Sequence, residues 1–116
     1  MSGIVFFGSE DYESIARFYR DEVGASVWLE QPACTILQYD NLLFGFCEAE
    51  RSETDGVLTF VTADRAGVDE FYDRFEERAR DEPSGDERFD IYNFFAEDPD
   101  GRTMEFQTFL HETEPI

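Results

Sequence analysis

The sequence predicts an α+β fold, made of two pseudo-symmetric βαβββ units whose curved mixed sheets surround a cleft. Residues 3–19 align without a gap to residues 56–72, as GIVFFGSEDYESIARFY over GVLTFVTADRAGVDEFY. A second match places Phe44-Gly45-Phe46-Cys47 over Met104-Glu105-Phe106-Gln107. Two copies of one supersecondary unit are therefore expected. The chain of 116 residues is read as a single domain, 1–116, with copy one at about 3–48 and copy two at about 56–110.

Each copy opens with an apolar run that is expected to form a strand, at residues 3–8 and 56–62. Asp11 and Asp64 follow as candidate helix N-caps, and Gly24 is expected to end the first helix. Apolar residues recur at helical spacing after each N-cap: Ile15, Phe18, Tyr19 and Val23 in copy one, and Val68, Phe71, Tyr72, Phe75 and Ala79 in copy two.

Three strands are expected after each helix, at 26–30, 33–39 and 42–47 in copy one and at 87–90, 92–97 and 103–109 in copy two. The polar stretch 81–87 reads as a loop, and Asp98-Pro99-Asp100-Gly101 as a type I turn. Asp40-Asn41 reads as a two-residue hairpin turn. That turn places Cys34 directly opposite Cys47, at a non-hydrogen-bonded pair with Cα atoms about 4.5 Å apart.

Side chains alternate along residues 103–109, so the two faces of this strand differ. Met104, Phe106 and Thr108 suit a helix-covered core, whereas Glu105, Gln107 and Phe109 face the other way. Strand parity and the repeat together give the candidate ligand-binding residues, which are Phe6, Cys47, Thr59, Glu105 and Gln107. Such a row suits a small organic ligand, although a filled core with satisfied polar groups has the same pattern. Glu105 is the candidate catalytic base, and its alternative role is a structural carboxylate paired with an arginine.

The charge balance limits the possible partners. There are 28 acidic residues against nine basic ones, all of them Arg, and the net charge is −19. Nucleic acid and anionic membrane are not expected as partners, because both need cationic patches. The composition resembles that of proteins from salt-loving archaea. No membrane-spanning run or leader segment is apparent, so a soluble, cytoplasmic protein is expected, with Cys34 and Cys47 as free thiols.

Two stretches carry a resemblance to a known family: Asp11…Phe18-Tyr19-Arg20-Asp21…Gly24, and Phe95…Asp98-Pro99-Asp100-Gly101…Glu105. With the paired βαβββ pattern, they resemble the vicinal oxygen chelate superfamily, which includes glyoxalase I, extradiol dioxygenases, and bleomycin- and fosfomycin-resistance proteins. In its metal-dependent members, ligands come from the first and last strands of each copy. The corresponding positions here are Ile4, Gly45, Val57 and Glu105.

Of these four side chains only Glu105 can ligate a metal, so no metal and no cofactor are expected. The sole histidine, His111, lies past the last strand and is expected to be solvated. The resulting hypothesis is a metal-free, homodimeric, glyoxalase/bleomycin-resistance-like protein that binds a small, partly apolar organic molecule. One alternative is a lyase or isomerase of the same superfamily with Glu105 as base. A second is a ferredoxin-like, dimeric, cofactor-free monooxygenase, which needs one strand fewer per helix.

The charge leads to a prediction about salt. Repulsion among the acidic side chains opposes folding at low ionic strength, and salt screens it. The melting temperature should therefore rise steeply between low and molar KCl, as measured by thermal unfolding followed by circular dichroism. An unchanged melting temperature would show that the repulsion is unimportant.

Overall fold

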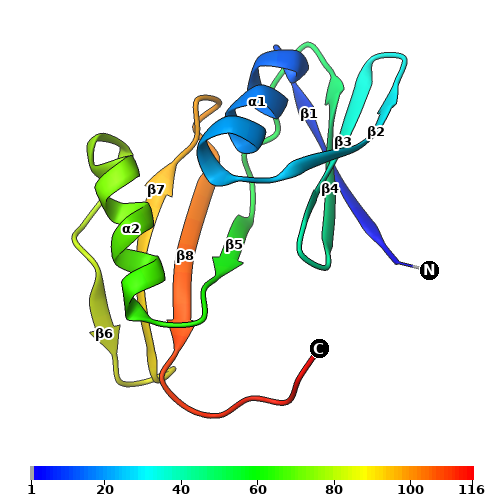
Figure 1. The fold of residues 1–116 in the computed structure, drawn as a ribbon. Helices are drawn as coiled ribbons and strands as arrows, with labels where there is room; N and C mark the ends of the chain where they lie inside the picture. Colours follow the sequence, from blue (N-terminus) through cyan, green and yellow to red (C-terminus); the bar gives the residue numbers. More distant parts are fainter. Residues whose placement is uncertain (1) are drawn as a thin grey trace. The chain divides into compact units, whose positions relative to one another are not determined.

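The computed structural model describes residues 2–116, which divide after Thr54 into a first and a second compact unit (Figure 1). The first unit consists of β1 (Ile4–Ser9), α1 (Tyr12–Phe18), the π-helical turn η1 (Tyr19–Val23), β2 (Ser26–Gln31), β3 (Cys34–Tyr39) and β4 (Leu42–Glu48). The second consists of β5 (Val57–Val61), α2 (Arg65–Phe75), the 3₁₀ turn η2 (Glu76–Arg78), β6 (Ser84–Asp86), β7 (Ile91–Glu97) and β8 (Thr103–Phe109).

The two units share one topology, which confirms the α+β fold of two βαβββ units. Their strand orders are β1-β4-β3-β2 and β5-β8-β7-β6, with the first pair in each sheet parallel and the others antiparallel. The registers also match, because Phe6 pairs with Gly45 and Thr59 pairs with Glu105. Three strands follow each helix, so the ferredoxin-like alternative, which needs one strand fewer, is wrong.

The first unit is built around Tyr19, which is fully buried under the helical segment. The Asp11 carboxylate caps α1 by accepting a hydrogen bond from Ser14 N at 3.2 Å. The chain then ends its π-helical turn at Gly24, whose φ of 99° favours glycine. The Tyr19 ring lies 5.4 Å from Phe44 and 5.3 Å from Phe46 between ring centroids. These contacts bury the helix face that its apolar spacing predicted.

The second unit is built around Phe106 of β8, which is fully buried against α2. Asp64 caps α2 by accepting from Gly67 N at 2.9 Å. The ring of Phe71 stacks on Phe106 with centroids 4.4 Å apart, and Phe75 follows at 5.4 Å. The core face of β8 is the predicted one, since Met104, Phe106 and Thr108 are all buried.

One predicted strand was wrong. Residues 87–90 form a turn, and the edge strand is Ser84–Asp86, within the stretch that was expected to be a loop. The cause is Asp86, whose Oδ1 accepts from the backbone N–H groups of Arg88 and Phe89 at 2.9 and 3.2 Å. A side chain that bonds its own following backbone in this way favours a turn over a strand.

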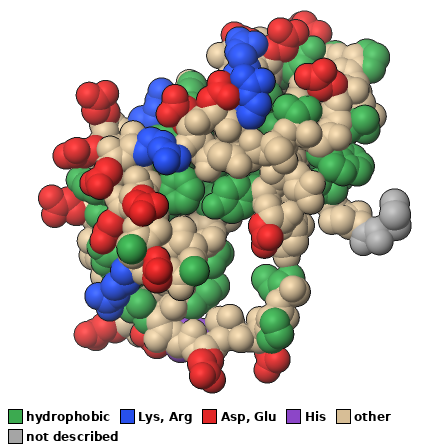
Figure 2. All heavy atoms as spheres, in the orientation of Figure 1, with side chains coloured by type: hydrophobic (Ala, Val, Ile, Leu, Met, Phe, Trp, Pro, Cys, Tyr) green, Lys and Arg blue, Asp and Glu red, His purple; other side chains and the backbone are tan. Residues whose placement is uncertain are grey.

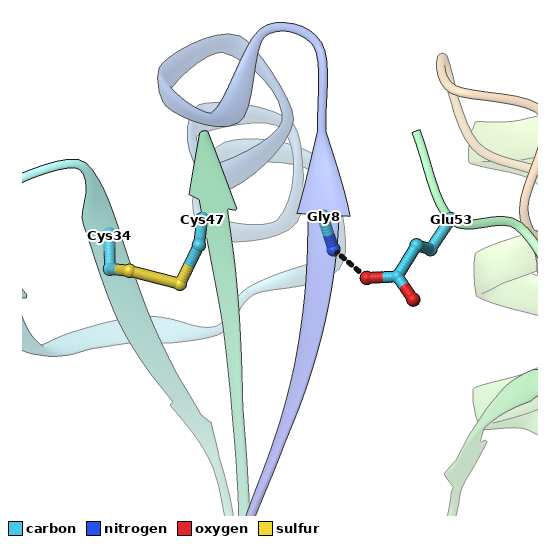
Figure 3. The surroundings of a disulfide bond; sticks show 4 residues. All are labelled: Gly8, Cys34, Cys47 and Glu53. Carbon is cyan, nitrogen blue, oxygen red and sulfur yellow. Dashed lines mark hydrogen bonds between the residues drawn. A yellow bond between two sulfur atoms is a disulfide. The ribbon is translucent and has the colours of Figure 1, made fainter. Parts of the chain in front are cut away.

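The cysteine register is confirmed, but the free thiols are not. Cys34 pairs with Cys47 across the β3–β4 hairpin, with Cα atoms 4.1 Å apart, and the two sulfurs form a disulfide (Figure 3). A backbone hydrogen bond from Glu48 N to Ala33 O, at 2.8 Å, marks the neighbouring pair as hydrogen-bonded. The cysteine pair is thus non-hydrogen-bonded, which is the closer of the two cross-strand arrangements. Free thiols were expected because most cytoplasms are reducing. In the structure the two cysteines are directly opposed across the hairpin and are bonded to each other.

The segment that follows β4 covers the C-terminal end of the β1 edge, at Gly8 (Figure 3). Gly8 N donates to Glu53 Oε1 at 2.6 Å, and Glu53 N donates to Gly8 O at 2.8 Å. A Cβ at Gly8 would lie 2.9 Å from Ala49 Cβ, so glycine is required for this approach. Pairing both backbone groups of Gly8 blunts an edge that would otherwise be open to other strands.

A buried ion pair closes the β7–β8 turn. Arg102 Nη1 donates to Asp98 Oδ2 at 2.8 Å, and both side chains are fully buried. Asp98 Oδ1 also accepts from the backbone N–H groups of Asp100 and Arg102. Gly101 N donates to Asp98 O at 2.9 Å, as the predicted type I turn requires, and Gly101 has a φ of 88°.

The sheet of the first unit carries an aromatic ring where the second unit carries a carboxylate. The Phe6 ring lies over Gly45, since a Cβ added there would be 2.7 Å from Phe6 Cδ1 and Cε1. Phe6 as a residue is 48% exposed. Gly45 therefore leaves room for an aromatic contact on this face, and any side chain at that position would displace it.

On the face seen in Figure 2, acidic side chains are widely spread and arginines are few. The ion pairs Arg20–Asp21 and Arg80–Glu97, in contrast to the Arg102 pairs, are exposed. None of the helices in residues 2–116 has the length and apolar character that a membrane span requires.

Arg102→Met should destabilise the protein by about 3–5 kcal/mol, because it leaves the Asp98 carboxylate buried without its cation. Asp98→Asn combined with Arg102→Met should recover much of that loss, since the charge is then gone and an amide oxygen remains for the turn. Arg20→Met, which breaks an exposed pair, is the matched control and should leave the urea midpoint almost unchanged. Equal midpoints for Arg102→Met and wild type would contradict the role of the buried pair.

Gly45→Ala should destabilise the protein by about 1–3 kcal/mol, because the new methyl group must push the Phe6 ring aside. In a Phe6→Ala background the same substitution should cost much less, so a double-mutant cycle in urea should give a clear coupling energy. Gly85→Ala is the control, as nothing lies within 4 Å of a Cβ at that strand glycine. Additive effects of the Phe6 and Gly45 changes would rule out the contact.

Candidate functional site

A carboxylate held by two neutral donors lies on the face of β8 that is turned away from α2. Thr59 Oγ1 donates to Glu105 Oε1 at 2.8 Å, and Asn93 Nδ2 donates to Glu105 Oε2 at 2.7 Å. Glu105 is 8% exposed. Both oxygens therefore accept hydrogen bonds from fixed neighbours on β5 and β7, which holds the carboxylate in one orientation. No arginine pairs with it among residues 2–116, so the structural alternative of a Glu–Arg pair is wrong.

This carboxylate lines a pocket of about 510 Å³ that lies entirely within the second unit. The pocket is of the size that small organic ligands occupy. Its apolar walls come from β5, β7, β8 and the turn before β7: Val57, Phe89, Ile91, Phe95 and Phe109. The remaining lining residues are polar: Asp86, Asn93, Glu105 and Gln107.

The register of the β7–β8 hairpin explains how these side chains converge. Asn93 lies directly opposite Gln107, and Phe95 directly opposite Glu105. Directly opposed residues point to the same side of a sheet, so all four side chains share the pocket face. Asn93 is paired with Gln107, but its side-chain amide reaches diagonally across the hairpin and donates to Glu105.

The strand that carries Asn93 is in turn fixed to α2. On the opposite face of β7, the Tyr92 hydroxyl donates to Asp69 Oδ1 at 2.6 Å. This hydrogen bond to an anion, assisted by partial burial, raises the pKa of Tyr92 above its usual value. The Arg65 guanidinium lies 5.1 Å from the centre of the same ring. These contacts stabilise the position of β7 and therefore of the pocket wall.

Three of the five residues predicted to bind a ligand come together in this unit. Thr59 contacts Glu105, and Gln107 lines the same pocket. Phe6 and Cys47 belong to the first unit, where Phe6 packs on Gly45 and Cys47 forms the disulfide with Cys34. Cys47 therefore offers no thiol to a ligand, contrary to the expectation of free thiols beside the cleft.

The sequence analysis did not single out the pocket residues of β7. Asn93 and Phe95 could have been found by extending the pairing across the Asp98–Gly101 turn, because the parity of β8 then determines the parity of β7. Asp86 and Phe89 carried no such signal. They reach the pocket from a strand and a turn whose positions the sequence pattern misplaced.

The residues at the family's metal positions do not fit a metal ion. Ile4, Gly45 and Val57 have no ligating atom, and both oxygens of Glu105 already accept protein hydrogen bonds. Residues 2–116 contain no group of three or more His, Cys, Asp or Glu side chains placed to hold a metal. A divalent cation needs several such ligands.

The first unit has its own hollow, of about 350 Å³, between α1 and β2. Its lining is mainly polar and mixes both charges, with Arg17 and Arg20 beside Glu13 and Glu30. Arg20 is already paired with Asp21 at 2.7 Å. Small-molecule sites are mostly apolar with a few placed polar groups, so the pocket of the second unit is the better candidate.

No family model and no curated protein matches this sequence. Solved structures do match its fold. A glyoxalase/bleomycin resistance protein/dioxygenase family enzyme from Burkholderia phytofirmans PsJN has a TM-score of 0.81 at 16% identity, over 92% of this chain and 97% of that one.

Two further structures agree. A glyoxalase/bleomycin resistance protein/dioxygenase from Nocardioides has a TM-score of 0.75 at 14% identity, over 99% of this chain and 87% of that one. A lactoylglutathione lyase from Agrobacterium tumefaciens has a TM-score of 0.72 at 21% identity, over 93% and 91% of the two chains. The chain therefore has the fold of the glyoxalase/bleomycin resistance/dioxygenase proteins, the fold that its resemblance to the vicinal oxygen chelate superfamily implied.

Proposed function

We propose that this protein binds a small, partly apolar organic molecule in the pocket of the second unit and does so without a metal. The pocket itself carries the proposal. It combines five apolar walls with a short row of oriented polar groups, and it has the volume of a ligand site. The metal-free part rests on Ile4, Gly45 and Val57, whose side chains cannot replace the ligands found in metal-dependent relatives of this fold.

A lyase or isomerase with Glu105 as base is the alternative function. Its support is a carboxylate that is mostly buried, oriented by two donors and located in an apolar pocket. A base must also have an acceptor position open to the substrate. A carboxylate has about four such positions, of which Thr59 and Asn93 occupy two. Solvent deuterium exchange into a bound ligand, lost in Glu105→Gln, would identify this activity.

We also infer the setting from composition. A net charge of −19, with nine arginines and no lysine, suits the salt-rich cytoplasm of a salt-loving archaeon, where such repulsion is screened. The Cys34–Cys47 disulfide does not follow from that setting, because most cytoplasms keep thiols reduced. Thiol labelling of protein taken directly from such cells would test the setting.

We further propose that the chain forms a homodimer through the β2 edge. Three consecutive apolar residues, Val27, Trp28 and Leu29, are exposed on this edge strand, and the pairing with β3 shifts between Val27 and Leu29. β2 contains a single acid, Glu30, so two negatively charged chains can approach here with little repulsion. A twofold contact of this kind would cover an edge that is otherwise open.

Fragment binding tests the proposed function. Small aromatic fragments, added in molar KCl with EDTA, should shift the backbone amide signals of β7 and β8, at residues such as Asn93, Phe95 and Gln107. Phe95→Ala should weaken their binding about tenfold, because it removes one apolar wall. Val5→Ala, at an exposed apolar residue outside the pocket, is the control. Binding that EDTA abolishes would contradict the metal-free proposal.

Light scattering tests the dimer. In molar KCl the mass should be twice that of the 13.5 kDa chain, and Trp28→Glu should halve it by placing a charge in the apolar contact. Thr113→Glu in the exposed C-terminal tail adds the same charge and should leave the dimer intact. A monomeric wild type at molar salt would refute the dimer.

A further inference from the structure

The pocket of the second unit is unusual in its charge. Two of its lining side chains are acidic, Asp86 and Glu105, and none is basic. Arg88 is on the same segment but is not among the lining residues, and its guanidinium lies 5.2 Å from the centre of the Phe89 ring. An anionic ligand would therefore enter a pocket without any lining cation, and both carboxylates would repel it.

No ion pair is formed by Glu105 among residues 2–116. Its two hydrogen bonds come from a hydroxyl and an amide, which orient the carboxylate but carry no positive charge. A mostly buried charge of this kind is costly unless a charge of opposite sign lies beside it. A cation with an N–H donor would use the remaining acceptor positions of the carboxylate and form a charge-assisted hydrogen bond.

The walls of the pocket suit the rest of such a molecule. Phe95 and Phe109, which are 37% and 43% exposed as residues, lie on the same face of the sheet as Glu105. Aromatic faces attract cations as well as apolar groups, and the Arg88 guanidinium already lies over Phe89 in this way. Ile91 adds an aliphatic surface. Binding can therefore combine an apolar body on the rings with a cationic group on Glu105.

We propose that the ligand of this pocket is a protonated primary or secondary amine on a small apolar or aromatic body, with its ammonium group bound to Glu105. The inference rests on the proposed function, since it names the chemical class of the molecule that the pocket binds. It also assigns a distinct role to Glu105, as the residue that selects for positive charge.

Three matched probes test the class: 2-phenylethylamine, 2-phenylethanol and 3-phenylpropanoate, which share an aromatic body and differ in charge. The titrations are done by calorimetry at pH 7 in molar KCl. The salt screens the attraction that the net charge of −19 exerts on any cation. Wild type should bind the amine at least about tenfold more tightly than the alcohol, as a charge-assisted hydrogen bond predicts, and should not bind the carboxylate.

The source of the preference is tested with two variants. Glu105→Gln should bring the affinities for the amine and the alcohol close together. Glu77→Gln, at an exposed acid outside this pocket, removes the same charge and should keep the wild-type preference. If Glu105→Gln still prefers the amine over the alcohol, the preference comes from the overall charge of the protein, and the proposal is overturned.

The titrations of wild type with the three probes test the amine class and the proposed function separately, whether or not the Glu105 variant folds. Equal affinity for amine and alcohol would overturn the amine class, and the pocket would remain a site for small, partly apolar molecules. Absence of binding by all three probes, together with failure of the aromatic fragments, would overturn the proposed function as well.

Discussion

The buried ion pair between Arg102 and Asp98 is the interaction on which the second unit depends. It closes the β7–β8 turn with both charges removed from water, and the same carboxylate accepts two backbone N–H groups. The closed turn joins β7 and β8 in the register that pairs Phe95 with Glu105. Because side chains alternate with period two, a slip by one residue would turn Glu105 toward α2 and Phe106 toward the pocket. The closed turn therefore helps to hold the register in which Phe106 faces the core and Glu105 faces the pocket.

One face of β8 packs against α2 and contributes to stability, and the other face lines the candidate ligand pocket. On the α2 face, Phe106 is surrounded by stacked rings, with Phe71, Phe75, Phe60 and Phe94 all within 6 Å between centroids. That face provides the apolar burial that holds the sheet to its helix. The opposite face can therefore carry Glu105, Asn93 and Gln107, whose burial contributes less to folding. A rigid strand supported from behind positions these polar groups better than a loop would.

The two copies of the repeat have kept their topology and diverged at the position of Glu105. In the first unit that position is Gly45, and the ring of Phe6 lies over it. In the second unit the β5 residue paired with Glu105 is Thr59, whose hydroxyl donates a hydrogen bond to the carboxylate. An aromatic–glycine contact is apolar, and a hydroxyl–carboxylate contact is polar, so only the second unit offers an oriented charge to a ligand. The disulfide, by contrast, belongs to the first unit alone.

The sequence by itself determined the elements other than the edge strand β6, the repeat, both helix caps and the two faces of β8, because these depend on residues close together along the chain. The alternation of side chains along the strands, together with the repeat, also predicted that Thr59, Glu105 and Gln107 share a face of the sheet. The tertiary structure decided the rest. Asp86 bonds the backbone of residues 88 and 89, so the edge strand lies elsewhere than predicted. The hydrogen bond from the Asn93 amide to Glu105 was also decided by the tertiary structure. The burial of Arg102 was likewise decided by the tertiary structure. For the cysteines, spacing predicted that Cys34 and Cys47 lie opposite each other, and the structure added the bond between their sulfurs.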